Sequence, residues 1–169
     1  MADWCEIVYR QLKAHQVTAV AHVPDIVLAP LIARLEADES FTVTQLSREE
    51  EGVGVLAGSF LGGRRGALLL QGSGLGNCVN ALASLTIPYQ LPLLLIVSPR
   101  GELGEWNPSQ VPMGRALRPI LEALQIQHHT LQPEEDIAVT VDMAASLAFA
   151  TNTVVALIVS PRLSGGKRE

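Results

Sequence analysis

Three adjacent glutamates, Glu49, Glu50 and Glu51, have the clearest capacity for chemistry in this sequence. They precede a run of small residues at 52–60, which would let another backbone or another chain come close. A carboxylate at the mouth of such a helix loses water when a partner covers it, and it can then act as an acid or a base. Carboxylates at a helix start also suit the positive end of the helix dipole. The dipole or exposure to solvent accounts for at least two of the three.

A glycine-rich stretch, GSGLGN at residues 72–77, follows an apolar segment and opens a helix. Its spacing approaches a dinucleotide fingerprint, but Asn77 stands where the last glycine belongs. The next apolar segment ends in Ser98 and Pro99, without the acid that would hold a ribose. The stretch therefore favours a tight backbone passage where a flat ligand approaches a helix N-terminus, or else a plain strand-to-helix turn.

Other polar residues follow apolar segments and could reach the same edge of a sheet. Asp25 comes after Val23 and Pro24, at a position where an aspartate can cap a helix. Arg100 could meet an anionic substrate through its guanidinium, or it could be a surface arginine in a loop. The pair at 128–129, two histidines, is interpreted as ordinary residues at the end of a strand.

Apolar segments of strand length alternate along the chain with helical patterns. Strands that are apolar on both faces and alternate with helices form parallel sheets covered on both sides. The sequence therefore predicts a single doubly wound α/β domain with a mostly parallel sheet of about six strands. The ends of those strands meet at one edge, where ligands bind. The predicted strands lie at residues 17–23, 41–46, 66–71, 91–97, 126–131 and 153–159.

The bulk composition excludes several classes of protein. The 169 residues carry a net charge of -5 and no basic stripe, which argues against nucleic acid as a partner. Hydrophobic residues make up 48% and charged residues 17%, so we expect another chain to cover part of the surface.

Location and domain limits follow from the same sequence. Two cysteines without a disulfide pattern, no secretory signal and no apolar run of membrane length indicate a cytoplasmic protein. We expect one domain over residues 1–160 and a flexible tail over 161–169.

Several stretches together resemble the thiamine-diphosphate enzymes. Glu49 lies nine residues before Gly58, a spacing similar to that of the pyrimidine-binding domain of this family. Three stretches, HVPDIVLAPLI, LLQGSGLGNCVNALASL and SPRGELGEWNP, resemble its sulfopyruvate and phosphonopyruvate decarboxylase branch. A fourth stretch, QVPMGR at 110–115, favours the alpha subunits on the sulfopyruvate side. The resemblance covers about residues 5–160 and implies the thiamine-diphosphate-binding fold.

The resemblance implies roles for particular residues. Glu49 would contact the aminopyrimidine ring and help the cofactor lose its thiazolium proton. Asp25 would lie near the substrate and act in catalysis, while Arg100 would bind the substrate. Relatives of this branch often read Gln-Asn-Ser-Gly, whereas Gly72 replaces the asparagine here, which leaves the substrate open. The histidine pairs of some relatives follow a different strand, so that role is not carried over to this chain. The cofactor-binding set would be Glu49, Gly72, Ser73, Gly74 and Asn77.

The resemblance also implies a partner. Relatives hold the diphosphate through Mg²⁺ with a Gly-Asp-Gly motif and a later asparagine on a second domain, whereas none of the five aspartates here has glycine on both sides. A beta subunit would therefore supply the Mg²⁺ ligands, in a hetero-oligomer such as α₂β₂ or a higher multiple. The expected activity is decarboxylation of sulfopyruvate to sulfoacetaldehyde. The alternatives are phosphonopyruvate decarboxylation, which gives phosphonoacetaldehyde, a regulatory module with the same fold, and a nucleotide-binding domain.

Overall fold

A six-stranded, all-parallel sheet forms the centre of the computed structural model, which describes residues 3–165. The strand order is β2-β1-β3-β4-β6-β5, so the predicted doubly wound α/β fold is confirmed. Every predicted strand is present, and β2 is the shortest because only residues 42–45 of the predicted strand 41–46 pair with β1. The strands are β1 (Val17–His22), β2 (Thr42–Gln45), β3 (Arg65–Gln71), β4 (Leu93–Ser98), β5 (Gln127–Leu131) and β6 (Val154–Val159).

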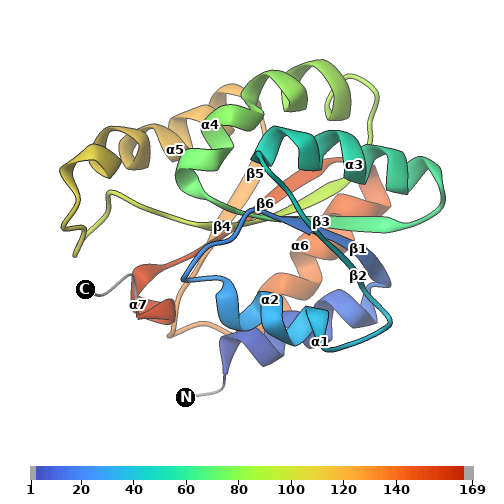
Figure 1. The fold of residues 1–169 in the computed structure, drawn as a ribbon, viewed down its shortest axis with the longest axis horizontal. Helices are drawn as coiled ribbons and strands as arrows, with labels where there is room; N and C mark the ends of the chain where they lie inside the picture. Colours follow the sequence, from blue (N-terminus) through green and yellow to red (C-terminus); the bar gives the residue numbers. More distant parts are fainter. Residues whose placement is uncertain (1–2, 166–169) are drawn as a thin grey trace.

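Helices cover both faces of this sheet (Figure 1). One face carries α1 (Trp4–Ala14), α2 (Ala29–Glu36) and α6 (Ile137–Thr151). The other face carries α3 (Glu49–Leu61), α4 (Gly72–Ala81) and α5 (Val111–Ala123). A π-helical turn, Leu82–Thr86, continues α4 beyond Ala81.

Two apolar clusters hold these layers together. The first lies between the sheet and α1, α2 and α6, and the second lies between the sheet and α3, α4 and α5. Successive strand residues alternate between the clusters: Leu69 belongs to the first, while Leu68 and Leu70 belong to the second. All residues of β4 and β6 are buried. Burial on both faces explains why these strands are continuously apolar rather than alternating.

The winding of the chain opens a crevice between β1 and β3. The chain leaves β1 for α2 on one face of the sheet, and it leaves β3 for α4 on the other face (Figure 1). Adjacent strands whose connections part in this way form the topological switch point where doubly wound proteins bind ligands. The carboxyl ends of β1 and β3 therefore define the place to look for a site.

The segment that follows β6 lies at the carboxyl edge of the sheet, beside Val27 and the loop after β4. The predicted tail at 161–169 begins with a short helix, α7 (Pro161–Ser164), whose Leu163 N–H donates to Ser160 Oγ. Residues 166–169, the rest of that tail, lie outside the described residues, and the boundary at 160 stays a prediction. In the part of the chain that the structure describes, no helix has the length and apolar character needed to cross a membrane.

Candidate active site

Glu49 is the first residue of α3, and the three neighbouring glutamates have different contacts. Glu51 Oε2 accepts from the backbone N–H groups of Ser47 at 3.0 Å and Arg48 at 3.3 Å, which closes the start of the helix. Glu50 pairs with Arg48 at the surface, at 3.0 Å. Glu49 takes part in neither arrangement, so its carboxylate is left to face α4.

The Glu49 carboxylate lies directly against the start of α4. Asn77 Nδ2 donates to Glu49 Oε2 at 3.0 Å, and Oε1 has no protein donor. A methyl group at Gly74 would come within 2.4 Å of Glu49 Cγ, Cδ and Oε1, so only glycine leaves room for this side chain. The predicted cofactor residues Glu49, Gly74 and Asn77 are thus in mutual contact. Together they present one carboxylate oxygen, Oε1, that has no hydrogen-bond partner among residues 3–165.

A buried thiol lies behind this carboxylate. Cys78 is fully buried, and burial, followed by the charges of Glu49 and Glu50, raises the pKa of its thiol to about 12. A thiol with that pKa stays protonated at neutral pH and is a poor nucleophile. Cys78 therefore packs in the core and leaves Glu49 as the ionisable group on this side of the site.

Asp25 and the glycine loop meet across the crevice between β1 and β3. Asp25 Oδ1 accepts from the backbone N–H groups of Val27 and Leu28, both at 3.0 Å. This turn precedes α2, so the predicted helix begins at Ala29 instead of directly after Asp25. Gln71 Nε2 donates to Asp25 Oδ2 at 3.1 Å, and Ser73 Oγ donates to Gln71 Oε1 at 2.8 Å. Gln71 was not among the predicted site residues; its signals in the sequence are its place at the end of β3 and its match to the first residue of the Gln-Asn-Ser-Gly pattern of the relatives.

Arg100 is a buried arginine, not an exposed one. Its Nε and Nη2 donate to the two carboxylate oxygens of Glu105 at 2.6 and 2.7 Å, and both side chains are under 8% exposed. Glu105 also accepts from the backbone N–H groups of Gly101 and Asn107 at 3.0 Å each. Arg100, through its hydrogen bonds and then its charge, lowers the pKa of Glu105 to about 2. The pair therefore fixes the loop after β4, and contact of Arg100 with substrate stays a prediction.

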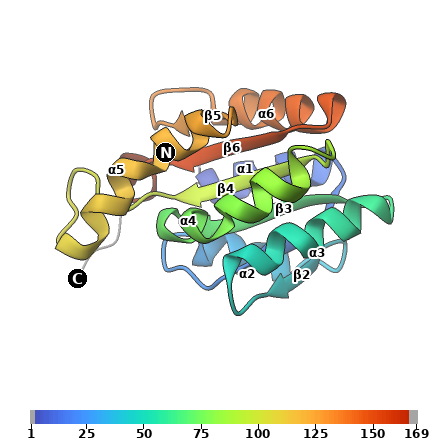
Figure 2. The same cartoon turned by 90° about the horizontal axis from the view of Figure 1, so that it is seen from above.

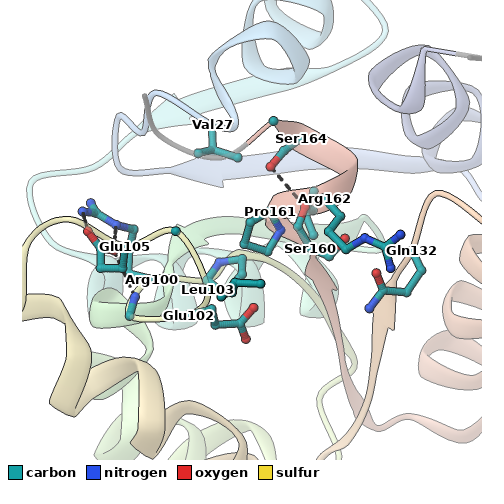
Figure 3. A pocket seen from close by; sticks show the side chains of 15 residues that line it. Val27, Arg100, Glu102, Leu103, Glu105, Gln132, Ser160, Pro161, Arg162 and Ser164 are labelled. Carbon is teal, nitrogen blue, oxygen red and sulfur yellow. Dashed lines mark hydrogen bonds and ion pairs between the residues drawn. The ribbon is translucent and has the colours of Figure 1, made fainter. Parts of the chain in front are cut away.

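A cavity of about 350 Å³ lies beside this loop (Figure 3). Its walls come from the loop after β4, from the segment after β6, from Gln132 after β5 and from Val27 before α2. The ion pair of Arg100 and Glu105 forms one wall, and Arg162 lies on the opposite side. The edge of the sheet is therefore hollowed next to Arg100 and Val27, where a small ligand could enter.

The histidine pair lies elsewhere. His128 and His129 belong to β5, which forms the edge of the sheet opposite to β2. His129 Nε2 pairs with Glu135 at 2.8 Å, and His128 Nδ1 contacts the carbonyl of Ile126 at 3.1 Å. Within the described residues no group of three or more His, Cys, Asp or Glu side chains could hold a metal ion.

Comparisons with known proteins show the family to which the chain belongs. The family model described as "Thiamine pyrophosphate enzyme, N-terminal TPP binding domain" matches residues 3–106, which include Glu49 and the glycine loop. The chain therefore belongs to the thiamine pyrophosphate enzymes, through their N-terminal domain. Within them it belongs to the branch that contains the sulfopyruvate decarboxylase alpha subunits and the phosphonopyruvate decarboxylases.

The relatives differ in how much of their length is matched. The chain is 36% identical to sulfopyruvate decarboxylase subunit alpha of Methanocaldococcus jannaschii, over 89% of both chains. It is 37% identical to the subunit of the same name from Methanothermobacter thermautotrophicus, over 93% of this chain and 95% of the relative. Phosphonopyruvate decarboxylase of Streptomyces viridochromogenes is 38% identical over 66% of this chain, which spans only 28% of that relative.

A solved structure has the same fold. A 2-oxoglutarate:ferredoxin oxidoreductase from Magnetococcus marinus aligns with 96% of this chain at a TM-score of 0.72 and 12% identity. The chain spans 29% of that protein. At this identity the likeness concerns the fold alone.

Proposed function

We propose that this chain is the alpha subunit of a heteromeric, thiamine-diphosphate-dependent sulfopyruvate decarboxylase, which forms sulfoacetaldehyde and CO₂. The observation that carries the proposal is the contact of Glu49 with Gly74 and Asn77 in a chain that matches separate alpha subunits over nearly their whole length. The activity is that of a carboxy-lyase. Phosphonopyruvate decarboxylation is the second candidate, since two such decarboxylases match this chain at 38% and 43% identity, over about a quarter of their own length.

The residues of this chain suit the organic end of thiamine diphosphate. When bound, the cofactor supplies a thiazolium carbon that adds to the keto group and accepts the electrons released as CO₂ leaves. Glu49, with Oε1 free, would hold the aminopyrimidine and exchange a proton with its ring nitrogen. At the start of α4 the side chains of Gly72, Ser73 and Gly74 are small, so the cofactor could approach the backbone closely there. Asp25 would face the substrate from across the crevice.

The diphosphate end needs a second subunit. The relatives are named as alpha subunits, which implies a partner. We propose that a beta subunit carries the Mg²⁺ ligands and the diphosphate site, in an α₂β₂ complex or a higher multiple. Carboxylate and amide oxygens of that subunit would hold the Mg²⁺, which would offset the negative charge of the diphosphate.

The exposed face of α3 and α4 is the surface that we propose for this partner. Figure 2 shows the two helices side by side on one face of the sheet. Gly54 and Gly58 have no atom within 4 Å of the place where a side chain would begin, so this part of α3 is open. Val55 and Leu61 are 44% and 76% exposed on the same helix. Because Glu49 begins α3, a subunit seated on this face would close the site over its carboxylate.

The test is a turnover assay of the co-expressed complex with thiamine diphosphate and Mg²⁺. Sulfopyruvate and phosphonopyruvate are supplied side by side, and release of CO₂ and aldehyde is measured. We expect turnover of sulfopyruvate to exceed that of phosphonopyruvate, and we expect calorimetry to detect little cofactor binding to the isolated chain. A complex that decarboxylates neither compound would contradict the proposal. We further propose a cytoplasmic location, supported by the free, buried thiols of Cys5 and Cys78.

A further inference from the structure

Gln71 bridges the two sides of the crevice with its amide. Its Nε2 donates to Asp25 Oδ2 at 3.1 Å, and its Oε1 accepts from Ser73 Oγ at 2.8 Å. The opposite amide orientation would place Oε1 against a carboxylate oxygen, with no proton between them. The Asp25 carboxylate, which can only accept, therefore sets the orientation of the amide, whereas the Ser73 hydroxyl can donate or accept. In this orientation Ser73 holds the far end of the amide, and the near end holds Asp25.

Asp25 is held from two strands at once. The turn after β1 provides two N–H donors for Oδ1, from Val27 and Leu28. The end of β3 provides the donor for Oδ2, through Gln71. Removal of Gln71 Nε2 would leave one oxygen without a protein donor, and the carboxylate would be free to turn. The direction in which Asp25 presents its charge thus depends on a side chain from the other side of the crevice.

The charges around Asp25 make this direction important. Arg100, two residues after β4, is a cation that the charge of Asp25 reaches: Glu105 raises the pKa of its guanidinium most strongly, and Asp25 adds to that rise through its charge. The guanidinium is already neutralised by Glu105, so it does not replace the hydrogen bond from Gln71. Glu49 is held separately, by Asn77. The site thus has two carboxylates, each oriented by its own side-chain amide.

We propose that Gln71 is a positioning residue for the substrate step: it orients the Asp25 carboxylate toward the 2-oxoacid in the crevice between β1 and β3. The inference rests on the proposed function. In this arrangement Glu49, held by Asn77, contacts the cofactor, whereas Asp25, held by Gln71, faces the substrate. A reacting group displaced by about 1 Å costs on the order of 100-fold in rate, so the loss of one orienting bond is measurable.

The first test uses Gln71→Met in the αβ complex, because methionine keeps the length and removes both hydrogen bonds. We expect kcat for sulfopyruvate to fall about 10- to 100-fold, the range typical for the loss of an orienting partner, with KM and cofactor affinity little changed. Deuterium exchange at the thiazolium carbon of the bound cofactor should keep its rate, because it depends on Glu49. A crystal structure of the variant complex should show Asp25 Oδ2 turned away from its present position.

The second test uses Gln71→Glu, which places a carboxylate against Asp25. We expect activity at neutral pH at or below that of Gln71→Met, and recovery as the pH falls, because a protonated Glu side chain donates to Asp25 as the amide does. Gln71→Met should show no such recovery. A merely structural role for Gln71 predicts the same pH profile for both variants. If Gln71→Met assembles poorly, recovery of Gln71→Glu at low pH is compared with the pH profile of the wild-type complex instead.

Gln127→Met is the matched control. Gln127 begins β5 at the far edge of the sheet, is exposed, and forms no side-chain hydrogen bond with the described residues. We expect wild-type kcat from this variant. An active complex in which Gln71→Met equals Gln127→Met, or in which Gln71→Glu fails to recover at low pH, overturns the inference alone. A wild-type complex without decarboxylase activity overturns the proposed function and this inference together.

Discussion

At the scale of single residues, the structure separates three glutamates that are equivalent in the sequence. Glu51 closes the helix start and Glu50 pairs with Arg48 at the surface, while Glu49 turns toward Asn77. The spacing to Gly58, as in the resembling family, indicates Glu49 as the proposed contact of the aminopyrimidine ring. The contacts of Glu50 and Glu51 explain why neither is proposed for that role. A carboxylate that already accepts two backbone N–H groups cannot also reach a ligand beyond α4.

Glu49→Gln should therefore abolish decarboxylation while the complex still assembles. Loss of a proton-transfer group typically costs about 100- to 10,000-fold in rate. The measurement is kcat of the complex, with Glu50→Gln as the matched control, because the neighbouring side chain faces the surface. An unchanged kcat in Glu49→Gln would move the role to another glutamate.

Gly74→Ala should lower activity far more than stability. The added methyl would meet Glu49 within 2.4 Å, and it would displace a flexible side chain without disturbing the core. We expect an activity loss of at least about 10-fold and a stability change under about 1 kcal/mol, the ordinary effect of a tolerated glycine-to-alanine change. Turnover of the complex and urea unfolding of the isolated chain measure the two effects. Equal turnover with Gly74→Ala would show that Glu49 does not need this space.

At the scale of elements, the loop after β4 is ordered by one buried ion pair. Glu105 accepts hydrogen bonds from Nε and Nη2 of Arg100 and from two backbone N–H groups of the loop. It therefore neutralises the arginine and holds the two ends of the loop segment together. Glycine is required where the loop meets α5: a methyl at Gly114 would come within 2.0 Å of Arg100 O. The loop therefore forms a fixed wall of the cavity in Figure 3, and its conformation depends on the charge of Glu105.

This charge predicts how stability depends on pH. The pKa of Glu105 is lowered from 4.5 to about 2 in the fold, so the ionised form is favoured there. Its contribution is present above the unfolded value and is lost as pH falls from about 4.5 toward about 2. The free energy of unfolding should fall less steeply in this window in Glu105→Gln than in the wild type. Glu39→Gln, at an exposed position, should keep the wild-type slope; equal slopes in all three proteins would refute the assignment.

At the scale of the whole molecule, exposed apolar residues lie on helices of both faces of the sheet, and one of these helical surfaces adjoins the site. The face of α3 and α4 begins at Glu49 and is open over Gly54 and Gly58. The outer face of α6 exposes Val139 and Met143 on the other side of the sheet. Only a partner on the first face can reach the ligand end of Glu49, because the sheet separates the second face from α3.

Gly58→Arg should prevent assembly with the beta subunit while the isolated chain stays folded. Arginine has space on the free helix, but it would occupy the volume that the partner needs. Met143→Arg on α6 is the matched control and should leave assembly unchanged. Light scattering of the co-expressed subunits measures assembly, and thermal unfolding measures the fold. A reversed result would place the partner on α6.

Much of the fold could be predicted from local patterns in the sequence. The apolar runs of β4 and β6 are buried on both faces, and this burial requires helices on both sides. Gly72 opens α4 directly after β3, as the glycine stretch indicates. These features depend on backbone preferences and on the spacing of apolar residues, both of which act over short distances along the chain.

Contacts between distant segments were decided by the tertiary structure alone. Gln71 and Asp25 are 46 positions apart, and they meet because β1 and β3 are neighbours in the sheet. Glu49 and Asn77, 28 positions apart, meet because α3 packs beside α4. A single sequence indicates which residues can donate or accept a hydrogen bond. The pairs that form depend on strand order and helix packing, and these result from burial of the whole core.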